Sequence, residues 1–168
     1  MLAAAHKTRQ YVLLALLSCV ALLASCARSS SEEWVGEAEQ AHAVADRAQT
    51  PEQRQQAGEA LERVLESARS RGLKTEAALA VQQDVYYRLA ELALADGKAD
   101  VALRWTREGL ALGEQASVFS ANLWISQGRA HEALGDKAAA SEAYFEALKV
   151  NEVLFERSLG DDPETDEP

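Results

Sequence analysis

Small and apolar residues recur every three or four positions between residues 32 and 159, with polar and charged residues between them. In residues 51–70, for example, Ala57, Leu61, Val64 and Ala68 follow this spacing. Such a pattern lines one face of a helix, and no segment shows the strict alternation of a strand. The pattern predicts six helices, at residues 32–48, 51–70, 74 or 75 to 96, 99–112, 117–134 and 137–159.

Helix boundaries are marked by capping residues and glycines. Thr50 and Gln53 have the spacing of a capping box, and Pro51 falls at the first helical position. Glycines such as Gly72 follow the apolar runs, where a helix ends most easily in the left-handed conformation. Helices of this length with short connections form antiparallel hairpins, so the prediction is an all-α fold of six helices in three pairs.

The amino terminus has the pattern of an export signal. His6, Lys7 and Arg9 form a short positive region, and residues 11–24 contain no charge. Fourteen residues are too few to cross a bilayer, which needs about 20. A positive start followed by a short apolar core is typical of a secretory signal peptide.

The residues after the apolar run resemble the lipobox of bacterial lipoproteins. This motif is a Leu/Ala/Ser-type tripeptide before a cysteine, here residues 23–25 and Cys26. The resemblance implies a signal peptide at residues 1–25, a diacylglycerol thioether on Cys26, and a tether at residues 26–31. By the same resemblance, Ala27 favours an exported protein anchored to the outer membrane and facing the periplasm. The alternative is an ordinary signal peptide or an uncleaved helix, with Cys26 incidental.

Two segments of the chain align with each other at an offset of 38 residues. The matching positions are Tyr86, Leu89, Ala90, Gly97, Ala102 and Gly109 in the first, and Trp124, Gly128, Gly135, Asp136, Ala140, Tyr144 and Ala147 in the second. The pattern resembles the tetratricopeptide repeat, a helix-turn-helix unit of 34 residues. The chain departs from that pattern at Thr106, Gln127, His131 and Glu152, which stand where the family has an aromatic residue, leucine, tyrosine and proline.

The tetratricopeptide resemblance implies a right-handed α-solenoid over residues 32–159. It assigns small residues such as Gly128 and Ala140 to close helix crossings, and Trp124 and Tyr144 to the core between hairpins. These positions are therefore expected to be architectural.

The composition limits the classes of partner. The chain has 27 acidic and 17 basic residues, a formal net charge of −10. A nucleic-acid-binding protein needs a basic surface for the phosphates, so this class is disfavoured. Residues 160–168 are acidic and contain no large apolar side chain, and we expect them to be a disordered tail.

Residues that could carry out catalysis or bind a metal are scarce. Cys19 and Cys26 are the two cysteines, and the predicted processing leaves no free thiol. His131 and Glu132 begin like a zinc-protease motif, but Gly135 occupies the place of the second histidine. We therefore expect neither an enzyme nor a cofactor or metal site. An enzyme acting on glycans through paired carboxylates is the alternative, and it would need a pocket with a carboxyl group of raised pKa.

The remaining candidate site is the concave face that the resemblance implies, which the first helix of each hairpin lines. Its expected exposed residues are Asp84, Tyr87, Arg88, Glu91, Asn122, Ile125, Ser126, Arg129 and Glu132. The arginines would bind carboxylates of a peptide, and Tyr87 and Ile125 would supply apolar contacts. These residues favour a membrane-anchored, non-catalytic adaptor for an envelope protein or peptide. The alternatives are a solvated helix face without a ligand and a self-associating spacer lipoprotein.

Overall fold

The computed structural model describes residues 33–113 and 116–160, and these ranges are helical with no strand. The predicted signal peptide, Cys26 with its tether, and tail residues 161–168 lie outside the described residues. Gly160, predicted to begin the tail, is the last residue of a helix. The helices comprise residues 33–46, α2 (Pro51–Ser70), α3 (Glu76–Ala95), α4 (Ala99–Leu110), α5 (Val118–Ala133) and α6 (Lys137–Gly160).

The predicted capping box begins α2. The backbone N–H of Gln53 donates to the Thr50 hydroxyl at 3.2 Å, and the Gln53 side chain accepts from the Thr50 N–H at 3.0 Å. The box satisfies N–H groups that the first turn of a helix leaves without a partner. Thr75 caps α3 and Ser117 caps α5 through the same kind of bond to the N3 backbone.

The connections after α2, α3 and α5 share one geometry. Gly72, Gly97 and Gly135 each have positive φ, between 64° and 80°, which glycine adopts without the steric cost of a Cβ. The residue after each glycine donates its N–H to a carbonyl five positions earlier; for Lys98 and Asp136 this distance is 2.9 Å. The chain therefore reverses direction sharply at each glycine.

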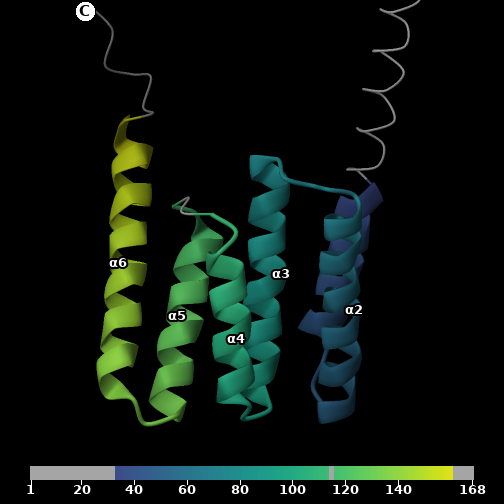
Figure 1. Ribbon diagram of the computed structural model, residues 1–168, viewed down its shortest axis with the longest axis horizontal. Coiled ribbons are helices and arrows are strands. Elements are labelled where there is room, and N and C mark those ends of the chain that lie inside the picture. The colour runs from purple at the N-terminus through teal and green to yellow at the C-terminus, as the bar shows by residue number, and fades with distance from the viewer. Residues whose placement is uncertain (1–32, 114–115, 161–168) are drawn as a thin grey trace, which may run out of the picture.

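The helices stand side by side in a row from the 33–46 helix and α2 to α6 (Figure 1). α3 packs against α2, α4 and α5; α4 packs against α5, and α5 against α6. In Figure 1, residue 33 and the end of α6 lie along the upper edge of the row, with the α2–α3 and α4–α5 connections. The lower edge holds the turns that close the three hairpins.

The largest buried cluster joins the first three helices and reaches α5 through Leu123. Trp34 is fully buried, and its indole N–H donates to the carbonyl of Val64 at 2.9 Å. Leu61, Val85 and Leu123 are also fully buried in this cluster. Burial of these side chains attaches the 33–46 helix to α2 and α3.

Two glycines mark close contacts between helices. A Cβ added to Gly109 of α4 would lie 2.8 Å from Cβ of Tyr86 and 2.8 Å from a methyl of Leu123. A Cβ on Gly128 of α5 would overlap the ring of Tyr144 on α6. The close crossing expected at Gly128 is therefore present. Trp124 was expected in the core between hairpins, and this prediction is wrong: its side chain is partly exposed, and the neighbouring Leu123 is fully buried instead.

Candidate functional site

The predicted site residues of α3 and α5 meet at Glu91, on the surface that we call the α3–α5 face. The Ser126 hydroxyl donates to Glu91 Oε1 at 2.7 Å. One terminal nitrogen of Arg129 donates to both carboxylate oxygens of Glu91, at 2.7 and 2.6 Å. Glu91 therefore binds two side chains of the neighbouring helix, and the bond to Glu91 raises the pKa of Arg129 further.

Arg88 connects the α3–α5 face to the 33–46 helix. Its guanidinium pairs with Asp46 of that helix and lies 3.5 Å from Asp84, one turn earlier on α3. His42 Nδ1 lies 3.3 Å from the same Asp84 carboxylate. The polar side chains of α3 thus make specific contacts with the helices on both sides.

Not every predicted residue lies on the exposed face. Ser126 was expected to be exposed but is fully buried, because its hydroxyl points between α5 and α3 toward Glu91. Glu132 is exposed but belongs to the other side of α5, where it accepts a hydrogen bond from the Tyr144 hydroxyl of α6 at 2.8 Å. The face keeps as partly or fully exposed residues Asp84, Tyr87, Arg88, Glu91, Asn122, Ile125 and Arg129.

A small groove of about 220 Å³ opens beside Tyr87, between the 33–46 helix and α3. Burial, followed by the charge of Glu91, raises the pKa of the Tyr87 hydroxyl. This hydroxyl is therefore protonated at neutral pH and available as a hydrogen-bond donor. The groove is lined by Ala45, Asp46, Tyr87, Arg88, Glu91 and Leu92.

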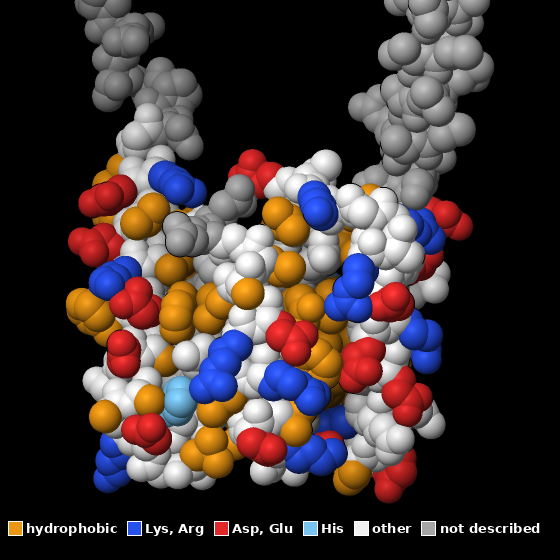
Figure 2. Space-filling view, viewed as in Figure 1, with side chains coloured by type: hydrophobic (Ala, Val, Ile, Leu, Met, Phe, Trp, Pro, Cys, Tyr) orange, Lys and Arg blue, Asp and Glu red, His pale blue; other side chains and the backbone are white. Residues whose placement is uncertain are grey.

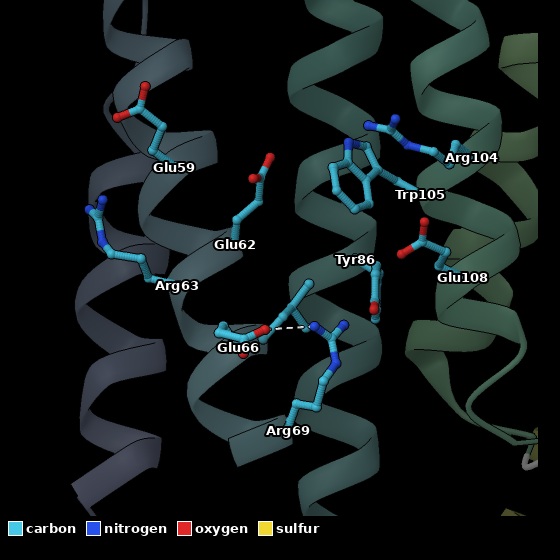
Figure 3. Close-up of a pocket in the computed structure, with 10 residues that line it drawn as sticks. Glu59, Glu62, Arg63, Glu66, Arg69, Tyr86, Arg104, Trp105 and Glu108 are labelled. Atoms are coloured by element: carbon cyan, nitrogen blue, oxygen red, sulfur yellow. Dashed lines mark hydrogen bonds and ion pairs between the residues drawn. The ribbon is translucent and has the colours of Figure 1, made fainter. Parts of the chain in front are cut away.

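A larger groove, which we call the α2–α4 groove, has a volume of about 640 Å³ and lies between α2 and α4. In Figure 3 the Trp105 ring of α4 and the Glu62 carboxylate of α2 point into it from opposite walls, with Tyr86 of α3 at its base. Figure 2 shows hydrophobic side chains along this part of the surface, between acidic and basic ones. The remaining lining residues are Glu59, Arg63, Leu65, Glu66, Arg69, Arg104 and Glu108.

Side chains of the α2–α4 groove largely interact with one another. The Arg104 guanidinium lies 4.6 Å from the centroid of the Trp105 ring, and the Tyr86 and Trp105 rings are 6.1 Å apart. Burial and then the charge of Glu108 raise the pKa of Tyr86. The sequence analysis missed this groove because it treated Tyr86 only as a repeat position. One signal in the sequence could have indicated the groove: Glu59, Glu62 and Glu66 are three and four residues apart, so they lie on one face of α2.

The described residues show no arrangement typical of a metal site. Within residues 33–113 and 116–160, no three His, Cys, Asp or Glu side chains converge where they could hold a metal ion. Glu52 and Asp96 have a lowered pKa, the first through hydrogen bonds at the start of α2 and the second through its bond to Arg54. No helix in the described part of the chain is both long enough and apolar enough to cross a membrane.

Comparison with known proteins found no match: no protein-family model, no curated protein and no solved structure corresponds to this chain.

Proposed function

We propose that this chain is a lipid-anchored, non-catalytic adaptor of the bacterial envelope, which binds a protein or peptide on its α3–α5 face. The anchor rests on the sequence, where a short apolar run ends at a lipobox-like tripeptide and Cys26. Two or more acyl chains hold a protein stably at a membrane, whereas one binds only marginally. Attachment to a surface raises the effective concentration of partners on that surface.

The adaptor proposal includes a tetratricopeptide-type right-handed stack of hairpins. Two observations support it. Helix α3 contacts its hairpin partner α4 and the next first helix, α5, which is the contact order of stacked hairpins. Gly97 and Gly135, 38 residues apart, also both have positive φ in equivalent turns.

The observation that carries the binding proposal is the groove beside Tyr87, where the 33–46 helix meets α3. Asp46, Arg88 and Glu91 line this groove together with Tyr87, and α5 joins them because Arg129 binds Glu91. Arg88 is paired with Asp46, and Glu91 with Arg129, so these side chains are already fixed in position before a ligand binds. Such preorganisation reduces the entropy that binding must offset.

A bound peptide has specific contacts available on this face. The Tyr87 hydroxyl can donate to a backbone carbonyl, and Ile125, 37% exposed, offers an apolar surface. Arg129 keeps about half of its side chain in solvent while it binds Glu91, so its guanidinium can also donate to a carboxylate of the ligand. We therefore propose an extended peptide with apolar and acidic residues as the ligand class.

Site-specific photo-crosslinking in intact envelopes tests the adaptor proposal. A photoreactive amino acid replaces Ile125, and the matched control replaces Gln56, an exposed residue on α2. We expect a defined adduct from position 125 that Arg129→Ala weakens, and no such adduct from position 56. Equal adducts from both positions, or none from position 125, would contradict binding on the α3–α5 face.

A further inference from the structure

The outer side of α6 carries the most exposed apolar surface in the described residues. Phe145, Leu148, Phe155 and Leu159 are each between 58% and 66% exposed. Among α2 to α6, α6 packs only against α5, so this side of the helix has no partner there. Hydrophobic side chains are visible over α6 at the edge of Figure 2. Several exposed apolar side chains on one side of a helix mark an interaction site more often than scattered single residues do.

The exposed residues of α6 follow a coiled-coil repeat. Successive steps of four and three residues connect positions 141, 145, 148, 152, 155 and 159, so that they form one stripe along the helix. The buried residues Ala140, Ala143 and Ala147 form a separate stripe toward α5. α6 therefore has two packing faces, of which α5 covers one. Beside the outer stripe lies a groove of about 570 Å³, lined in part by Tyr144, Phe145 and Leu148.

We propose that this outer stripe of α6 binds the same stripe of a second copy of the chain, with the two helices antiparallel. Phe145 of each copy then packs against Leu148 of the other. Ser141 of each copy faces Glu152 of the other, so that the two Glu152 side chains do not face each other. Such a pairing is isologous, because both copies use the same residues.

The charges beside the stripe select this register. In an antiparallel pair, the residues that directly follow the 141/148/155 positions face one another across the interface. Here these are Glu142, Lys149 and Glu156. The register that joins Phe145 to Leu148 places Glu142 of each copy beside Lys149 of the other, which gives two opposite-charge pairs.

The competing arrangements bring like charges together. Moving the helices by one heptad places Lys149 against Lys149 and Glu142 against Glu156 of the second copy. A parallel, in-register pair places Glu152 against Glu152 inside the stripe. Both carry a repulsion that the proposed register avoids.

Other occupants fit the stripe less well. Residues 161–168 contain no large apolar side chain that could cover it. An anionic membrane would be repelled by Glu142, Glu146, Glu152 and Glu156, which accompany the stripe along the whole helix. A second copy supplies both the apolar residues and the lysines that this surface requires.

The test is analytical ultracentrifugation of the full chain in a nonionic detergent, over a range of protein concentrations. We expect a monomer–dimer equilibrium that E142K weakens about tenfold. The double reversal E142K/K149E restores opposite charges and should restore the wild-type dimer. The matched control is E156K, on the same helix, which has no charged partner in the proposed register and should leave the equilibrium unchanged.

Three results would overturn the pairing: a monomer at every concentration, an E142K variant that dimerises as well as or better than the wild type, or a double reversal that fails to recover. Circular dichroism of each variant checks that its helices are intact. The pairing does not rest on the adaptor proposal, because it uses α6 and leaves the α3–α5 face open. Loss of the adduct at position 125 and loss of the dimer are therefore separate outcomes.

Discussion

Gly109→Ala tests how closely α3 and α4 are packed. The added methyl would lie 2.8 Å from Cβ of Tyr86, which is fixed to the backbone of α3 and cannot rotate away. It would also lie 2.8 Å from a methyl of Leu123 on α5. Overpacking of this kind costs about 1–3 kcal/mol, and two short contacts place the cost near the upper limit. Alanine recovers about 1 kcal/mol through its helix propensity, so we expect a net loss of about 2 kcal/mol.

The matched control for this prediction is Gly58→Ala, in α2. There the nearest atom to an added Cβ is a Leu89 methyl at 4.0 Å, an ordinary contact. Only the propensity gain remains, so this variant should be more stable by about 0.5–1 kcal/mol. Urea unfolding followed by circular dichroism measures the free energy of unfolding of both variants. In thermal unfolding, the Tm of Gly109→Ala should fall by roughly 4–8 °C. The reasoning is refuted if Gly109→Ala is as stable as Gly58→Ala.

Three further predictions concern the anchor, the core and the pH dependence. Cys26→Ser should abolish metabolic lipid labelling and partitioning into the detergent phase; continued labelling would exclude this anchor. Trp34→Ala should cost about 3–5 kcal/mol in urea unfolding, because the ring is fully buried and its N–H is bonded to Val64; a loss below 1 kcal/mol would show that the 33–46 helix contributes little to stability. Burial lowers the pKa of His42 below its ordinary 6.5, against the attraction of Asp84. The imidazole of the unfolded chain therefore takes up its proton at a higher pH than that of the folded chain, so the free energy of unfolding should fall as the pH drops below about 6.5. His42→Gln should remove this part of the loss. Urea unfolding at pH 7.5 and 5.5 would show the difference.

The helices could be predicted because local signals agree with the apolar spacing. Thr50 and Gln53 start α2 as predicted, and Gly97 and Gly135 end α3 and α5 in the left-handed conformation. The ends of some helices differ by one or two residues, since tight turns replace the last helical bonds. α4, for example, ends at Leu110, and the N–H of Leu112 bonds back to Gly109. Such turns depend on how the chain leaves the helix, which spacing alone does not specify.

The tetratricopeptide resemblance implied a face on α3 and α5, but it did not specify the contacts there. A helical pattern shows that Arg88, Glu91 and Arg129 lie on the outer side of their helices. It does not show that the rotation of α5 against α3 brings Arg129 and Ser126 to the same carboxylate. The sequence analysis treated both arginines as available to a ligand, whereas each is bound to an aspartate or glutamate of another helix. Side chains long enough to reach a neighbouring helix require the packed structure before their partners can be named.

Anchoring through Cys26 and pairing through α6 together restrict how a dimer can lie on a membrane. Residue 33 lies at the same edge of the row as the end of α6 (Figure 1), so antiparallel α6 helices place residue 33 of the two copies at opposite edges of the dimer. Residues 26–32 span at most about 25 Å when extended, whereas the 24 residues of α6 are about 36 Å long. A tether therefore cannot span the length of α6, so two copies that stand upright on one membrane cannot pair in this register. If the chain is anchored through Cys26, a dimer on one membrane instead lies with its two-fold axis along the membrane normal, which places residue 33 of both copies at the same height.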